Sequence, residues 1–225
     1  MKTNHALCGL ISGLLLLAAG TSTAHAALII GNAGFETPST SDYVARPTTG
    51  VGQEWTFLSA SGIARNGSFG MNAGSGSSGQ FGFIASDSGF DGIMSQTITF
   101  DSAGLYNLSY LEAGRINSVY IAAGSLNYNI TIQDGINPAI FSTSDFTDSN
   151  EAFTTTSYDF TVPTAGSYTL SFTAAGSHDG LTSSNVAAFD NVAITASPVP
   201  EPGTALFGVA CVGVAALRRR RNSAV

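Results

Sequence analysis

The alternation of apolar and polar residues through the middle of the chain predicts β-strands. From Leu105 to Leu111, Tyr106, Leu108 and Tyr110 point to one side and the polar residues between them to the other, the period of two that marks a half-buried strand. Two further segments repeat it, Leu126 to Gln133 with Tyr128, Ile130 and Ile132 inward, and Tyr168 to Ala174 with Tyr168, Leu170 and Phe172 inward and Thr169, Ser171 and Thr173 outward.

No segment of the central region carries a helical stripe of period 3.6, and clusters of Gly, Ser, Thr and Asn between the alternating runs indicate turns. The pattern therefore predicts an all-β sandwich of about nine short strands. The further strands are expected at Ala27 to Ile30, Trp55 to Leu58, Phe81 to Ala85, Ile93 to Phe100, Phe153 to Val162 and Val186 to Thr195.

An internal repeat supports a sandwich. At a constant offset of 62, one set of residues aligns with a second set of the same character, and the two sets share the sequences AGLYNLS and AGSYTLS. We interpret the copies as equivalent hairpin corners in two packed sheets, an arrangement common in jelly rolls. The first set is Ile98, Phe100, Ala103, Gly104, Tyr106, Leu108 and Tyr110, and the second is Phe160, Val162, Ala165, Gly166, Tyr168, Leu170 and Phe172.

The N-terminus predicts a secretory signal helix. Lys2 gives a positive start, Leu7 to Ala19 an apolar core, and Ala24 and Ala26 an Ala-x-Ala cleavage site. Residues 1–26 are therefore predicted to be a signal peptide, and the mature chain is expected to begin near Ala27.

The C-terminus predicts a second apolar helix. A Val199-Pro200-Glu201-Pro202 motif precedes the fifteen apolar and small residues from Gly203 to Leu217. At about 1.5 Å per residue these span roughly 22 Å, short of the roughly 30 Å of a hydrocarbon core. The basic cluster Arg218, Arg219, Arg220 and Arg221 is expected on the cytoplasmic side, which leaves the proline motif on the far side. A permanent anchor and a nonspecific hydrophobic terminus are the alternatives.

In order and position, the tail resembles the PEP-CTERM sorting signal of Gram-negative bacteria, which exosortase-type membrane proteases process. The resemblance implies an exported protein that is held in the inner membrane transiently by residues 198–225. It would reach the cell surface or the extracellular space after C-terminal cleavage, with an exosortase-type protease as its partner.

Composition limits the chemistry of the remaining domain, residues 27–197. Cys8 and Cys211 lie in the two removed segments, which excludes a disulfide and a thiol nucleophile from the domain. Its three arginines against fourteen acids give a formal charge of −11. Nucleic acid is excluded as a partner because phosphate backbones require clustered Lys and Arg. An acidic, lysine-free surface favours solubility outside the cell and offers oxygen ligands to calcium.

The domain also resembles the galactose-binding-like jelly rolls, which include several carbohydrate-binding modules. The likeness rests on the opening motif Asn32 to Glu36, on Trp55, on the repeated Tyr-x-Leu-Ser strands and on the closing motif Ala188 to Ile194. It implies that the first and last strands are neighbours with a structural calcium between them, held by Glu36 and Asp190. The alternative is that Glu36 only accepts a turn hydrogen bond and that Asp190 begins a strand.

Aromatic residues are the expected glycan contacts, yet burial is the better interpretation of most of them. Trp55 matches the buried tryptophan of that family, and large aromatics usually supply core area. Tyr43, Tyr110 and Tyr120 are weaker binding candidates, with packing as the more common role. A glycan site would otherwise depend on Asn, Asp and either of the arginines Arg65 and Arg115.

Catalytic patterns are weak. The run Gly74 to Gly79 matches a dinucleotide-binding pattern but leads into a strand instead of a helix. His178 is the one histidine of the mature chain, too few for a zinc cluster or a supported triad. The acids Asp87 with Asp91, and Asp145, Asp148 with Glu151, are expected in solvated loops, with weak secondary calcium binding as their one candidate role, and no laminarinase-type carboxylate spacing occurs.

Two functions follow from this sequence. The first is a non-enzymatic, exported surface or matrix protein associated with glycan or exopolysaccharide, as in a biofilm. The alternative is an extracellular polysaccharide hydrolase or lyase that uses two of the scattered acids.

Overall fold

The structure is a computed structural model that describes residues 30–47, 53–68, 79–87, 90–115, 125–135, 137–148, 152–177 and 185–197. All of them fall within one compact unit, Ala26–Ser197. The predicted signal and sorting helices lie outside the described residues. The described part of the chain holds no helix long and apolar enough to cross a membrane.

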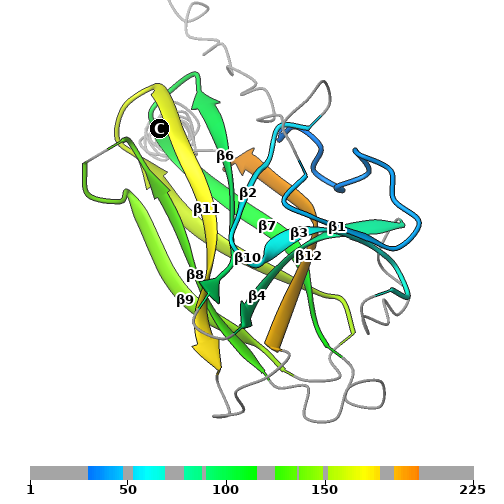
Figure 1. Cartoon of the computed structure of the whole chain (residues 1–225). Coiled ribbons are helices and arrows are strands. Elements are labelled where there is room, and N and C mark those ends of the chain that lie inside the picture. The colour runs from blue at the N-terminus through cyan, green and yellow to red at the C-terminus, as the bar shows by residue number, and fades with distance from the viewer. Residues whose placement is uncertain are drawn as a thin grey trace, which may run out of the picture. The chain divides into compact units, whose positions relative to one another are not determined.

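Two antiparallel sheets face each other, so the all-β jelly-roll prediction is confirmed (Figure 1). The strands of the larger sheet, in spatial order, are β1 (Tyr43–Ala45), β3 (Ser61–Arg65), β4 (Gln80–Asp87), β12 (Asn185–Ala196), β7 (Gly104–Gly114) and β10 (Thr154–Val162), with β5 (Phe90–Asp91) paired to β4. The strands of the five-stranded sheet are β2 (Thr56–Leu58), β6 (Ile93–Phe100), β11 (Gly166–Ser177), β8 (Leu126–Gln133) and β9 (Phe141–Thr147).

Eight of the predicted strands are present, but the described chain has twelve in all. Of the predicted strand at Ala27 to Ile30, only Ile30 is described, and it lies in no strand. The strands β1, β3, β5 and β9 were not predicted. β1 and β5 are very short, β3 is buried on both faces and so does not alternate, and β9 places the polar residue Asp145 inward. A loop was the wrong prediction for Asp145, and also for Asp87 and Asp91, which lie in β4 and β5.

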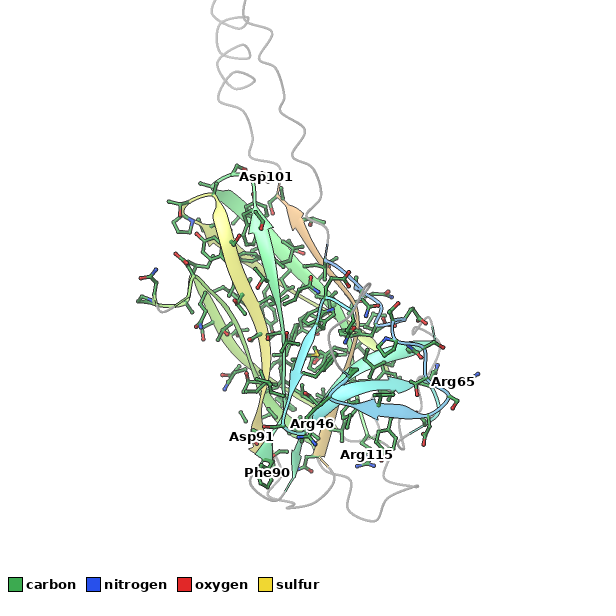
Figure 2. The ribbon with its side chains drawn as sticks, turned by 45° about the horizontal axis from the view of Figure 1, so that its top comes forward. Arg46, Arg65, Phe90, Asp91, Asp101 and Arg115 are labelled. Carbon is green, nitrogen blue, oxygen red and sulfur yellow. The ribbon has the colours of Figure 1, made fainter. Side chains whose placement is uncertain are left out.

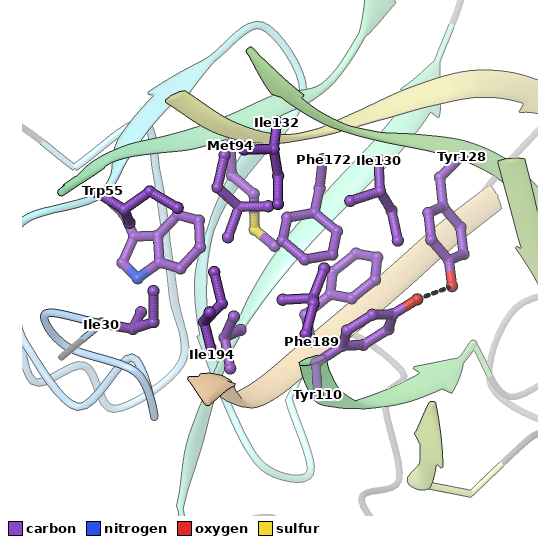
Figure 3. Packing of buried hydrophobic residues seen from close by; sticks show 14 of the residues in the cluster. Ile30, Trp55, Met94, Tyr110, Tyr128, Ile130, Ile132, Phe172, Phe189 and Ile194 are labelled. Atoms are coloured by element: carbon purple, nitrogen blue, oxygen red, sulfur yellow. Dashed lines mark hydrogen bonds between the residues drawn. The ribbon is translucent and has the colours of Figure 1, made fainter. Parts of the chain in front are cut away.

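The core lies between the sheets and consists of the residues that the alternation placed inward. Trp55 is fully buried, as predicted, with its ring centroid 5.1 Å from that of Phe35 and 6.2 Å from that of Phe172. Figure 3 shows this packing continuing through Phe189 to Tyr110 and Tyr128. Tyr110 is thus a core residue and not a surface contact. A smaller apolar cluster around Phe81, Phe83 and Val186 is also buried.

The two copies of the repeat form equivalent corners, although neither is a hairpin. Each corner carries its chain from one sheet to the other, and the copies pair with each other: Gly166 opposite Phe100, and Val162 opposite Gly104. In each corner a tyrosine hydroxyl donates to the carbonyl oxygen four residues earlier, at 2.9 Å, from Tyr106 to Ser102 and from Tyr168 to Thr164. Each glycine precedes its tyrosine by two residues and has a positive φ, 159° at Gly104 and 155° at Gly166.

Candidate functional site

The outer face of the five-stranded sheet consists mostly of hydroxyl and amide side chains, with the three apolar residues Leu58, Ile93 and Phe146 among them. We call it the hydroxyl face and define it by the outward-facing strand residues, which alternate with the buried ones and are exposed or half-buried. Not one of these described residues is charged. They are Thr56 and Leu58 of β2; Ile93, Ser95, Thr97 and Thr99 of β6; Ser167, Thr169, Ser171 and Thr173 of β11; Asn127, Asn129, Thr131 and Gln133 of β8; and Ser142, Ser144 and Phe146 of β9.

Strand register aligns these side chains into rows across the sheet. One row crosses all five strands with a hydroxyl at every position, through Thr56, Ser95, Ser171, Thr131 and Ser142. With neighbouring strands 4.7–4.9 Å apart, such a row spans about 19 Å. Solvent-facing strands normally carry charges, and this domain is strongly acidic, so a whole sheet face without charge marks a candidate binding surface.

A pocket of about 450 Å³ lies at one margin of the hydroxyl face. It is lined by Gly31, Glu54, Thr56, Ser95, Gln96, Thr97 and Thr169. Its volume falls within the usual range for small-molecule sites. Four of the lining residues therefore present hydroxyls, and Glu54 is the single charged side chain.

The opening motif of the chain forms a tightly bonded loop beside this pocket. The Asn32 side chain donates to the Thr37 carbonyl at 2.6 Å and to Gln53 Oε1 at 2.9 Å, while its Oδ1 accepts from the Thr37 N–H at 3.1 Å. Gln80 of β4 fixes the other side of the loop, since its Nε2 donates to the Phe35 carbonyl at 2.8 Å. The motif thus has a structural role at the start of the domain.

The predicted calcium ligands each accept a main-chain hydrogen bond. Glu36 Oε1 accepts from the Gln80 N–H at 3.2 Å, and Asp190 Oδ1 accepts from the Asn191 N–H at 2.7 Å. Asp190 is fully buried at an irregularity of β12, next to the contact in which the Val192 N–H donates to the Ala33 carbonyl at 3.1 Å. No group of three acidic, His or Cys side chains suited to a metal occurs among the described residues. A calcium ion held by these two carboxylates would therefore take most of its six to eight oxygen ligands from main-chain carbonyls or water.

A buried network of tyrosines and carboxylates connects the sheets at β7, β8, β9 and β10. Tyr128 donates its hydroxyl to Glu112 and lies 3.0 Å from the Tyr110 hydroxyl (Figure 3). Thr156 also donates to Glu112, and Tyr158 donates to Asp145. Burial raises the pKa of Tyr110, Tyr128 and Tyr158 well above the ordinary value of 10.0. These phenols therefore act as hydrogen-bond donors, and the carboxyl groups of Glu112 and Asp145 accept hydrogen bonds from within the protein.

The remaining sequence candidates are scattered. Tyr43 is 47% exposed on β1 of the larger sheet, and Arg65 is exposed at the end of β3. Arg115 is only 5% exposed, and Figure 2 shows it with Arg46 at the end of the sandwich opposite Asp101. Neither of the predicted glycan-binding arginines lines the pocket.

Other predicted residues lie outside the described part of the chain. They are Tyr120, His178 and Glu151; the glycines of the Gly-rich run before Gly79; the cleavage-site residues Ala24 and Ala26; the sorting motif Val199 to Pro202; and the basic cluster Arg218 to Arg221. Asp87 is placed in β4 but its side chain is not described, and Asp91 accepts from the Ser86 hydroxyl at 2.8 Å.

Sugar-binding modules and a glycosidase are among the solved structures that are similar to this chain. A CBM61 module in complex with β-1,4-galactotriose is similar with a TM-score of 0.50 at 13% identity, over 75% of this chain and 97% of the module. A CBM4 module has a TM-score of 0.48 at 15% identity, over 75% of this chain and 100% of the module. An arabinose-bound GH51 α-L-arabinofuranosidase has a TM-score of 0.48 at 12% identity, over 78% of this chain and 27% of the enzyme.

No family model matches the chain, and no curated protein does. The structural likeness, at such low identity, establishes the jelly-roll fold and leaves ligand chemistry to the residues of this chain.

Proposed function

We propose that this chain is a non-enzymatic, exported protein whose jelly-roll domain associates with extracellular polysaccharide through the hydroxyl face. The observation that carries the proposal is a complete, uncharged sheet face on a domain with a formal charge of −11. Hydroxyl and amide groups both donate and accept hydrogen bonds, as the hydroxyls of a sugar chain do. The shared fold with sugar-binding modules supports the same ligand class.

Affinity for a single sugar chain is expected to be low. The hydroxyl face has no Trp or Tyr and only Phe146 as an aromatic residue, so stacking contributes little. A net gain of about 1 kcal/mol for each of four or five hydrogen bonds corresponds to a Kd in the millimolar range. Many copies on a cell surface or in a matrix would retain a polymer by multivalency.

The test places a charge in the middle of the face. Ser171→Glu alters the central strand of the five-stranded sheet, where Ser171 lies opposite Ser95 and Thr131. The matched control is Ser109→Glu on β7, an outward-facing serine of the larger sheet opposite Ser157. Affinity electrophoresis of residues 26–197 in gels containing galactan, xylan or mixed-linkage glucan should show retardation that Ser171→Glu removes and Ser109→Glu preserves.

Equal retardation of both variants would reject the hydroxyl face as the site. Incubation of the same gels' polysaccharides with the protein, followed by assay of new reducing ends, tests the alternative of a hydrolase. A lyase would instead produce unsaturated ends that absorb in the ultraviolet. Turnover abolished by a carboxylate-to-amide change would overturn the non-enzymatic assignment.

Export and C-terminal processing belong to the same proposal and rest on the sequence motifs at the two ends. Intact-mass measurement of the protein recovered from its native host should give a chain that begins at Ala27 and lacks the apolar run from Gly203 to Leu217. Replacing Pro200 and Pro202 with Ala should keep the uncleaved chain in the membrane fraction. Cleavage unchanged in that variant would contradict exosortase-type recognition.

We also propose a structural calcium ion at Glu36 and Asp190, supported by the hydrogen bond from the Val192 N–H to the Ala33 carbonyl, which joins the closing motif to the opening motif. The measurement that tests it is given in the Discussion.

A further inference from the structure

Glu54, the one charged residue of the pocket, lies against a glycine. A Cβ atom added to Gly31 would be 2.5 Å from Glu54 Cγ and 2.8 Å from its Cδ, so the Glu54 side chain can occupy this position only because residue 31 has no side chain. Glu54 lines the pocket at the margin of the hydroxyl face together with Gly31.

Gly31 is itself held in place by a buried side chain. Gln96 of β6 accepts from the Gly31 N–H with its Oε1 at 3.0 Å and donates from its Nε2 to the Gly31 carbonyl at 2.8 Å. Gln96 is only 5% exposed, and both ends of its amide are used. Gln96 thus fixes the main chain of Gly31, against which the exposed Glu54 side chain lies.

Within the described chain, no positively charged side chain pairs with Glu54. Glu54 makes no hydrogen bond or ion pair with a described residue, and none of Arg46, Arg65 and Arg115 lines the pocket. Figure 2 shows Arg46 and Arg115 at the end of the sandwich away from Asp101. A carboxylate in a pocket that is also lined by four hydroxyl side chains offers a positive group both charge and hydrogen-bond acceptors.

We infer that the Glu54 pocket binds a protonated amino sugar, so that the polysaccharide preferred by this chain contains free amino groups. The inference rests on the proposed function, because the pocket continues onto the hydroxyl face, where the neighbouring sugar units would lie. The negative charge of the domain disfavours uronic and sulfated polymers by the same electrostatics.

The test compares three β-1,4-linked hexamers of nearly equal length: glucosamine, N-acetylglucosamine and glucose. Isothermal titration of residues 26–197 at pH 5.5 and low salt should give a Kd for the glucosamine hexamer about fivefold below the other two, the effect of one exposed charge pair. Added salt should remove the difference because it screens that pair. Glu54→Gln should abolish the preference and keep the weaker binding of the neutral hexamers.

Two further variants separate the pocket from general charge. Asp101→Asn removes the same charge at an exposed corner outside the pocket and should retain the preference. Gly31→Ala displaces the Glu54 side chain without changing the charge of the domain, and this variant should lose the preference for the glucosamine hexamer. Melting temperatures are recorded for every variant.

Each remaining outcome decides between the two proposals. Equal affinity for all three hexamers overturns the amino-sugar inference and leaves the proposed function standing. If Glu54→Gln and Asp101→Asn weaken binding of the glucosamine hexamer equally, the site is a nonspecific cation site and the inference is overturned. The same conclusion follows if hexalysine binds with the same affinity as the glucosamine hexamer. Binding of none of the hexamers, with no retardation in the polysaccharide gels, rejects the proposed function itself.

Discussion

Removal of one phenol oxygen from the buried network should be unusually costly. Tyr128→Phe deletes the hydroxyl that donates to Glu112 and lies 3.0 Å from the Tyr110 hydroxyl, while it leaves the ring in the core. A hydrogen bond to a carboxylate contributes about 1.5–3 kcal/mol and a neutral one about 1 kcal/mol. Because the site is fully buried, water does not replace the lost donor. The free energy of unfolding should therefore fall by about 2–4 kcal/mol.

The matched control is Tyr168→Phe, which removes a hydroxyl that donates to the Thr164 carbonyl at 2.9 Å at the edge of the sandwich. This loss should cost about 0.5–1.5 kcal/mol, since the carbonyl is neutral. Urea unfolding followed by tryptophan fluorescence of Trp55 measures both variants. For a domain of this size, Tyr128→Phe should lower the melting temperature by about 5–15 °C.

A double-mutant cycle tests the cause. In the Tyr128→Phe protein the carboxylate of Glu112 keeps the Thr156 donor but loses that of Tyr128. Adding Glu112→Met removes the buried carboxyl group and should restore part of the lost stability, because the penalty comes from a buried acceptor that has lost one donor. A coupling energy of at least about 1 kcal/mol is expected between the two positions. Purely additive losses, or a Tyr128→Phe variant no less stable than Tyr168→Phe, would refute this account.

Two other properties follow from the same structure. Burial raises the pKa of Tyr110, Tyr128 and Tyr158 above 10.0, so these phenols stay protonated in the folded chain when the unfolded chain ionises. The contribution of these tyrosines to the free energy of unfolding should be fully present below pH 10 and should fall above it, by about 1.4 kcal/mol per pH unit for each fully buried tyrosine. Urea unfolding midpoints measured from pH 8 to 11.5 check this. A Tyr128→Phe protein with the same dependence of stability on pH as the unaltered protein would contradict it. Calcium bound at Glu36 and Asp190 should raise the melting temperature reversibly, and Glu36→Gln or Asp190→Asn should remove the difference between calcium and chelator. A melting temperature of the unaltered domain that is the same in calcium and in chelator would exclude the calcium site.

The inward side chains of the longest strands could be predicted from the sequence because burial there depends on local alternation. β6 and β8 have the predicted bounds, and Tyr106, Tyr128 and Phe172 lie in the core as expected. The interpretation of Trp55 as a core residue is confirmed for the same reason. The repeat likewise fixed two equivalent corners, since each needs the same Ala-Gly-x-Tyr geometry.

The sequence could not predict which strands lie side by side, and the candidate site depends on that alone. The alternation identifies Thr169, Ser171 and Thr173 as outward residues. One strand with outward hydroxyls does not, however, distinguish a binding surface from an ordinary solvent-exposed strand. Pairing β11 with β6 and β8 aligns Ser171 with Ser95 and Thr131, residues far apart in the chain.

Tertiary structure also decided where the acidic side chains lie and which groups they contact. Nothing local in the sequence distinguishes Asp145 and Glu112 from surface acids, but in the fold Glu112 is buried, Asp145 is half-buried, and both accept hydrogen bonds from hydroxyls of other strands. Glu54 lies against Gly31, whose main chain is bonded to Gln96, and no local pattern in the sequence encodes these contacts. The sequence by itself determined the all-β class, the core side of each long strand and the strongly acidic charge, because these follow from near neighbours and composition. Long-range pairing decided the uncharged face and the pocket, because both are built from residues that only the folded sheets bring together.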